Sequence, residues 1–248
     1  MPTTGSQTIA DLLTQNHAYG LGLHGYGISV IEESGRTLAE ACEARGLHPG
    51  IVVTTLESQA QARHVTPQVQ HMPIELVIRY LRHMHGVFIK QRLPFLRYLI
   101  SGLETDADHH VLGQDLQLIF PLFAEDFIVH IYEEEDQLFT YIGQLLEATA
   151  KGAYLSRYWF LVENHSIASI AGAHEVHDDE MAGIRRLTDD YRIQPGMPLP
   201  LQMLYYELTC FERDLRIHAG VENNVLFPKA LKLEAYVRKT LQGLAKYN

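Results

Sequence analysis

Apolar residues recur at steps of three and four positions along most of the chain after residue 73, and strand-like alternation is scarce. Steps of this kind are typical of amphipathic helices that bury one face. The pattern predicts long helices near residues 74–102, 108–147, 152–190, 199–224 and 228–245. Because short polar or Gly- and Pro-containing segments separate them, we expect an all-α protein whose first four long helices form an antiparallel up-down four-helix bundle. Pro94 lies inside the first helix and is expected to kink it.

The first 64 residues show shorter helical patterns that glycines interrupt. A capped helix start follows Ser6, and the segment Thr37–Gly46 is typical of a helix that ends at glycine. Residues 65–73 resemble a linker. We therefore expect a small N-terminal helical domain at residues 1–64, a linker at 65–73 and the helical bundle at 74–248.

The chain has 248 residues, with 20 Lys and Arg against 30 Asp and Glu, and its net charge of −10 comes without a basic cluster. An acidic chain of this kind argues against a nucleic-acid partner. It has no apolar run near the roughly 20 residues that span a bilayer and no basic-then-apolar N-terminal signal. We expect a cytoplasmic protein without a membrane partner. Only two cysteines, Cys42 and Cys210, are present, which argues against a disulfide framework or a multi-cysteine metal site.

Histidine is the unusual residue of this chain, with fourteen copies. A histidine interrupts the apolar stripe of each of the four long helices, and the candidates are His85, His130, His177 and His218. Successive candidates are separated by about one helix, a turn and the return. Four histidines can therefore meet at one level of the bundle.

Two of these helices carry the same pattern, His-x-x-x-Glu, at His130 with Glu134 and at His218 with Glu222. Residues four apart lie on one helix face, so both glutamates face the core. A buried ionised carboxylate is costly unless it is paired or binds a metal. A pair of metal ions satisfies two glutamates and four histidines together, because imidazole suits iron and a carboxylate can bridge two metals. Six protein ligands leave open positions for an oxo bridge, water, dioxygen or nitric oxide.

On two helices a second histidine competes for the role of ligand. His83 and His85 lie two residues apart and face opposite sides of the first helix; His83 falls on the polar side, which favours His85. On the third helix, His174 and His177 both lie near the apolar stripe, and the periodicity leaves both open.

Further acidic residues lie near the two motifs. In the run Glu-Glu-Glu-Asp at residues 133–136, only Glu134 has the spacing of a ligand, and the rest is expected to form mostly a solvated face. Asp126 and Asp214 each lie four residues before a candidate histidine. Each is open to two interpretations: an acceptor for an imidazole N–H, or an exposed helix carboxylate.

Two segments, HIYEEEDQLF at residues 130–139 and HAGVENNVLFPKAL at residues 218–231, carry a resemblance to a known family. They resemble the hemerythrin-like HHE cation-binding domain and, more specifically, the ScdA-type di-iron proteins that repair iron–sulfur clusters. The resemblance implies two non-haem iron ions, bridged by an oxo group and by carboxylates. It implies a ligand set of His85, His130, Glu134, His177, His218 and Glu222. In this set Glu134 and Glu222 are the bridges, and His177 is chosen over His174.

The first 64 residues also resemble the small N-terminal domain of that family, and the match includes the segment Tyr26-Gly-Ile-Ser. The family usually has adjacent cysteines shortly after this segment, where the present chain has Val30-Ile31-Glu32. Cys42 lies in the following predicted helix and cannot replace a pair. This departure weakens the repair assignment and leaves the di-iron site untouched.

The resemblance implies a stress-response role: repair of iron–sulfur clusters damaged by oxidation or nitric oxide, through iron donation or nitric oxide chemistry. Damaged iron–sulfur proteins would then be partners, O2 or NO the small ligands, and a homodimer is compatible with the helices. The alternative is a hemerythrin-like module that binds or senses O2 or NO without turnover. A further rival is a scaffold protein, with zinc in the bundle. The sequence leaves open whether the protein is an enzyme.

Overall fold

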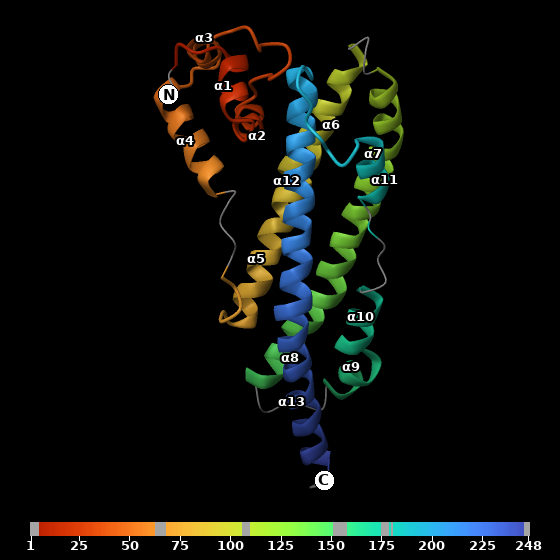
Figure 1. Cartoon of the computed structure of the whole chain (residues 1–248). Helices are drawn as coiled ribbons and strands as arrows, with labels where there is room; N and C mark the ends of the chain where they lie inside the picture. The colour runs from red at the N-terminus through yellow and green to blue at the C-terminus, as the bar shows by residue number, and fades with distance from the viewer. Residues whose placement is uncertain are drawn as a thin grey trace. The chain divides into compact units, whose positions relative to one another are not determined.

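The computed structural model describes residues 5–62, 68–105, 110–150, 158–174, 179 and 181–245 (Figure 1). Over these residues the regular elements are all helical, and β pairing is limited to an isolated antiparallel bridge between Thr8 and Thr37. The expected all-α fold class is confirmed. None of the described helices is both long and apolar enough to cross a membrane.

The N-terminal part of the chain forms four short helices: α1 (Ile9–Gln15), α2 (Tyr19–Gly25), α3 (Leu38–Glu43) and α4 (Pro49–Ala62). Capping boxes fix the starts of α1 and α3. The Thr8 hydroxyl accepts a hydrogen bond from the Asp11 backbone N–H, and the Thr37 hydroxyl accepts one from Glu40. The apolar faces of these helices are buried, with Leu12 fully enclosed.

The segment expected as one helix over 74–102 consists of α5 (Ile74–Val87), the π-helical turn η1 (Phe88–Arg92), α6 (Leu93–Ser101) and the 3-10 turn η2 (Gly102–Thr105). At the end of η1 the Leu93 backbone N–H bonds to the Phe88 carbonyl, five residues earlier rather than four. This widened turn ends two residues before Pro94, which has no N–H to donate. The helical segment therefore accommodates the proline by widening one turn.

The second and fourth long segments also contain π-helical turns. The second comprises α7 (His110–Glu133), η3 (Glu134–Phe139) and α8 (Thr140–Ala150). The fourth comprises α12 (Leu199–Val221), η5 (Glu222–Leu226) and α13 (Phe227–Ala245). The predicted break at Pro228 is wrong, because the Phe227 N–H bonds to the Glu222 carbonyl and Pro228 falls in the first turn of α13. A proline is tolerated there because the π-helical turn just before it interrupts the regular four-residue pattern of backbone hydrogen bonds, so the helical segment continues without an N–H at residue 228.

The third long helix, expected over residues 152–190, is not a single helix where the structure describes it. It is divided into α9 (Trp159–Asn164), α10 (Ile167–His174) and α11 (Ala182–Leu187). His165 is extended, with φ −126° and ψ 146°, and residues 189–191 have positive φ. The Glu234 carboxylate of α13 accepts a hydrogen bond from the Ile167 N–H at 3.4 Å and so supports the start of α10. This tertiary contact leaves no local signal in the sequence.

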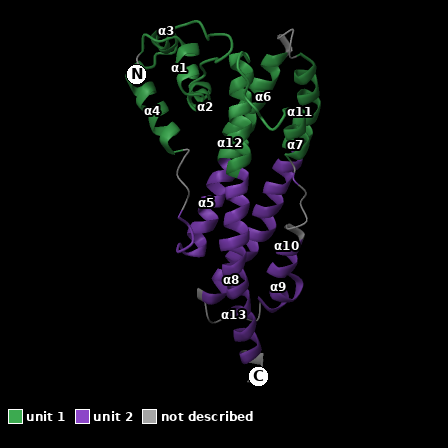
Figure 2. Ribbon diagram, viewed as in Figure 1, with its two compact units in different colours: residues 1–66, 87–124, 181–214 green, residues 67–86, 125–180, 215–248 purple. Residues whose placement is uncertain are grey.

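The chain divides into two compact units, shown in green and purple in Figure 2. Unit 1 comprises residues 1–66, 87–124 and 181–214, and unit 2 comprises residues 67–86, 125–180 and 215–248. Each unit combines segments from several parts of the chain. The division into domains at 1–64 and 74–248 with a linker at 65–73 therefore stays a prediction.

A continuous hydrophobic core fills unit 2. It takes buried residues from every long segment of that unit, among them Val77, Leu138, Val162, Ile167 and Leu226. Within the unit, α13 packs against α8, α9 and α10. Segments that are far apart in the sequence thus share one apolar interior, as expected of a helical bundle.

Removing one cap should loosen α3 locally. We predict that Thr37→Ala lowers the local stability of α3 by about 1 kcal/mol, because the Glu40 N–H loses its side-chain acceptor. Hydrogen exchange of the amides at 38–43 measures the change. Thr54→Ala serves as the control, because Thr54 is exposed in mid-helix and its hydroxyl donates only to the Gly50 carbonyl. Equal exchange in α3 of the wild type and Thr37→Ala would contradict the prediction.

Candidate metal centre

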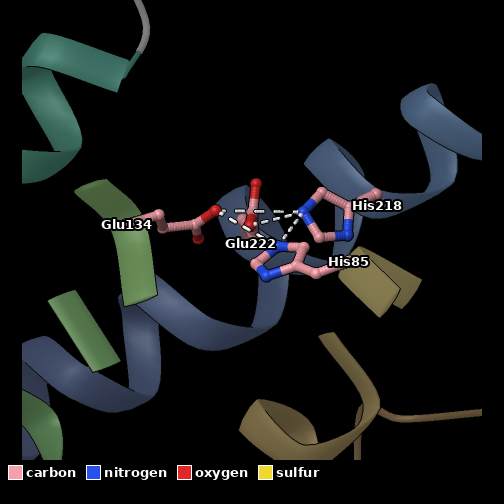
Figure 3. Close-up of side chains that lie close together, drawn as sticks. All are labelled: His85, Glu134, His218 and Glu222. Atoms are coloured by element: carbon pink, nitrogen blue, oxygen red, sulfur yellow. Dashed lines mark hydrogen bonds and ion pairs between the residues drawn. The ribbon is translucent and has the colours of Figure 1, made fainter. Parts of the chain in front are cut away.

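Four buried side chains of unit 2 converge at one point: His85, Glu134, His218 and Glu222 (Figure 3). One ligand atom from each lies within 4.8 Å of all the others. The His218 Nε2 atom is 2.9 Å from Glu222 Oε1, 3.2 Å from His85 Nε2 and 4.0 Å from Glu134 Oε2. His85 Nε2 is 3.5 Å from Glu134 Oε2. Two imidazoles and two carboxylates therefore present their ligand atoms to a common point.

Each of the four lies at the end or the start of a helical element. His85 is in the last turn of α5 and His218 in the last turn of α12. Glu134 is the first residue of η3, and Glu222 is the first residue of η5. Both carboxylates thus stand where an α-helix widens into a π-helical turn, a local distortion that is frequent at functional sites. Since the distortion begins only at the glutamate, the one-turn spacing from His218 to Glu222 keeps both on one face.

Charge is concentrated here without water to solvate it. Glu134 is 6% exposed and Glu222 1%. Within the described part of the chain, neither oxygen of Glu134 accepts a hydrogen bond. A buried carboxylate without such bonds is destabilising unless a cation lies near it. The arrangement therefore favours a positive charge at its centre.

In the metal-free protein, His218 can supply that charge. Burial by itself lowers the pKa of His218, but the Glu222 and Glu134 carboxylates outweigh burial and raise the pKa to about 9. A metal cation would take the place of this proton, since imidazole ligates through an unprotonated nitrogen. Histidine nitrogens and carboxylate oxygens are ligands for iron and zinc alike. The group is able to hold a metal ion.

The structure brings together four of the six predicted ligands. His130 is half-buried in the last turn of α7 and is not one of the four side chains that share the common point. His177 lies outside the described residues, and so does the side chain of His174. On α5 the buried histidine is His85, whereas His83 is exposed, as the helical pattern predicts.

Glu135 departs from the expected solvated face of residues 133–136. Its Oε1 atom lies 2.8 Å from His85 Nδ1, and its side chain is only 30% exposed. Glu133 and Asp136, in contrast, are exposed as expected. Glu135 lies in the π-helical turn η3, where the smaller rotation per residue changes the face on which residues after Glu134 lie relative to an α-helix. An α-helical spacing rule applied to the sequence could not have found this contact.

The two aspartates in front of the histidine candidates differ from each other. Asp126 is exposed on α7. Asp214, in unit 1, forms ion pairs with Arg92 and Arg213. Arg92 is buried, and it also pairs with the buried Glu207. Asp214 is thus engaged with arginines of unit 1.

The fold and the buried group define the class of protein: an all-α protein with a candidate metal centre built from histidine and glutamate. No family model matches the chain. The iron–sulfur cluster repair protein YtfE of Yersinia pseudotuberculosis serotype O:1b (strain IP 31758) is 24% identical over 187 residues, which cover 73% of this chain and 79% of that protein. The protein of the same name from Yersinia pestis (strain Pestoides F) gives the same identity and coverage. The resemblance to iron–sulfur cluster repair proteins is thereby confirmed, and the chain is a relative of them.

The raised pKa of His218 should make the metal-free protein sensitive to alkaline pH. A histidine whose pKa is about 9 when folded and 6.5 when unfolded stabilises the fold fully below pH 6.5, and this contribution is lost as the pH rises through about 9. We predict that wild-type protein in chelator loses more stability between pH 6 and pH 9.5 than His218→Gln does. Urea unfolding measures this, with the exposed-site variant His83→Gln as control. Parallel pH profiles for wild type and His218→Gln would refute it.

Proposed function

We propose that this protein is a non-haem di-iron protein that acts in iron–sulfur cluster repair under oxidative or nitrosative stress. The observation that carries the proposal is the buried group of two imidazoles and two carboxylates, in which the Glu134 oxygens accept no hydrogen bond from the described residues. A site of this chemistry is costly without a cation and well suited to a metal. The Yersinia relatives, named iron–sulfur cluster repair proteins, support iron as that metal and repair as the role.

The proposal assigns six ligands to two iron ions. His85, His218, Glu134 and Glu222 lie close enough to serve one compact site. For a second ion we add His130 and His177. His130 is one turn before Glu134 on the same helical segment, and His177 matches the ligand of the resembling family. The histidines would be terminal ligands and the glutamates would bridge the ions, together with an oxo group.

Bound iron would supply open positions for O2 or NO and a change of oxidation state. The chain would hold the charge of that iron with two buried carboxylates, whose surroundings exclude water. The apolar core of unit 2 lines this region, with Leu138 and Leu226 each four residues after a glutamate ligand. Damaged iron–sulfur proteins would be the partners, and the cytoplasm the compartment. Iron donation and nitric oxide chemistry are the two routes to repair, and a homodimer is compatible with either.

A second candidate function is reversible binding or sensing of O2 or NO without repair. The segment Val30-Ile31-Glu32 favours it, because it stands where the resembling family has adjacent cysteines. Val30 is buried, and the Ile31 N–H donates a hydrogen bond to the Tyr98 hydroxyl at 3.1 Å. This segment is therefore a packed part of unit 1 that holds no thiol.

Anaerobic iron loading tests the metal centre. We expect two iron ions per wild-type chain, with near-ultraviolet bands of an oxo-bridged pair, and loss of the iron in His218→Ala. Glu134→Gln, which keeps the side-chain volume, should also weaken loading because the buried charge disappears. His83→Ala is the matched control and should load normally, because His83 is exposed. A folded wild type that takes up no iron would exclude the di-iron proposal, and circular dichroism shows whether each variant stays folded.

A second assay distinguishes iron–sulfur cluster repair from reversible binding of O2 or NO. An iron–sulfur enzyme inactivated by NO is incubated with the iron-loaded protein. We expect wild type to restore its activity and His218→Ala to fail. Reversible NO binding by the loaded protein without restored enzyme activity would instead establish the binding or sensing function.

A further inference from the structure

We propose that Glu135 is a positioning residue that fixes the tautomer and orientation of His85 for metal binding. The proposal rests on the proposed metal centre and extends it to a residue beyond the six ligands. The Glu135 Oε1 atom lies 2.8 Å from His85 Nδ1, within unit 2. His85 is 1% exposed, so this ring finds its partners within the protein and not in water.

The chemistry of the two groups determines which nitrogen carries the proton. An ionised carboxylate can only accept, so His85 Nδ1 must donate its N–H to Glu135. In the neutral imidazole the lone pair is then on Nε2, the atom that lies 3.2 Å from His218 Nε2 and 3.5 Å from Glu134 Oε2. Nε2 therefore faces the common point in the form that binds a metal.

Two neighbours hold this arrangement in place. The Arg82 Nε atom lies 3.7 Å from Glu135 Oε2, and the Arg82 guanidinium carbon lies 5.6 Å from the centroid of the Phe139 ring. The His85 ring stacks on Phe139 with a centroid distance of 5.6 Å and an interplanar angle of 5°. Arg82 thus bridges the Glu135 carboxylate and the Phe139 ring, and the stacked Phe139 ring restricts rotation of the His85 imidazole.

The contact is formed from the π-helical turn η3. Glu134 and Glu135 are consecutive residues, yet their carboxylates approach opposite nitrogens of one imidazole. Successive residues of a π-helix are rotated about the helix axis by less than the 100° of an α-helix. Two neighbouring side chains therefore point in more similar directions. One turn of backbone therefore supplies both a candidate metal ligand and the group that orients the facing ligand.

A carboxylate behind a histidine ligand also makes that histidine a stronger donor. Such partners commonly change metal affinity by about 10- to 100-fold. Loss of Glu135 should therefore weaken metal binding and, because one negative charge leaves the surroundings, shift the reduction potential of bound iron to a more positive value.

Metal titration with Co²⁺ tests the affinity. We expect Glu135→Ala to bind Co²⁺ about 10- to 100-fold more weakly than the wild type. Glu133→Gln is the control, because Glu133 precedes Glu134 on the exposed side and loses the same charge. It should bind Co²⁺ as the wild type does.

The variant Glu135→Gln separates the effect of the hydrogen bond to His85 from the effect of the negative charge of Glu135. Its amide oxygen can still accept the His85 N–H, so it should recover most of the affinity lost in Glu135→Ala. It should keep the positive shift of the iron potential, which a merely structural role would not produce. Nitrogen-15 NMR of the histidine rings should show His85 with its proton on Nδ1 in the wild type and Glu135→Gln, and a changed signal in Glu135→Ala.

The outcomes distinguish this proposal from the function on which it rests. If the wild type binds neither Co²⁺ nor iron, the proposed metal centre fails and the positioning role fails with it. If the wild type binds Co²⁺ and Glu135→Ala binds it equally well, with an unchanged His85 signal, the metal centre stands and the positioning role is overturned.

Discussion

Two carboxylates buried in the apolar interior of unit 2 are the constraint on which this site depends. Glu134 and Glu222 are almost inaccessible to water, and the core around them is built from leucine, valine and aromatic side chains. A carboxylate in such an interior is destabilising unless hydrogen bonds or a nearby cation stabilise it, and the Glu134 oxygens accept no hydrogen bond from the described residues. In the metal-free protein the positive charge falls to His218, whose pKa those same carboxylates raise to about 9. A bound metal cation and a proton on His218 are therefore alternative sources of the positive charge that stabilises the two carboxylates.

The backbone departs from α-helical geometry at the two buried glutamates. The π-helical turns η3 and η5 begin at Glu134 and Glu222 themselves. Up to each glutamate the chain keeps the four-residue spacing that places His218 with Glu222 on one face. Beyond Glu134, within the widened turn η3, the Glu135 side chain is only 30% exposed and contacts His85. The turn η5 ends at Leu226, two residues before Pro228, so the same distortion lies beside both the site and the proline.

The all-α class and the meeting of His85, Glu134, His218 and Glu222 could be predicted because both follow from local periodicity. Residues that share a helix face share a core, and helices of similar length bring their polar core residues to one level. What the sequence could not show depends on contacts between segments. The division between α9 and α10 is supported by Glu234, which lies 67 positions away from Ile167. The π-helical turns are likewise not encoded in any spacing rule, so the role of Glu135 and the continuity through Pro228 were missed.

The N-terminal part limits where thiol chemistry could take place. A Cβ added at Gly102 would collide with Ile31 Cδ1, so the glycine leaves room for the Ile31 side chain. The remaining cysteine of this part, Cys42, is buried, and burial raises its pKa, which disfavours the reactive thiolate. Neither the segment beside Tyr98 nor Cys42 therefore offers an accessible thiolate. Cys210 is buried as well. For the proposed cluster repair, the histidine and glutamate side chains of unit 2 are therefore the candidate reactive groups among the described residues.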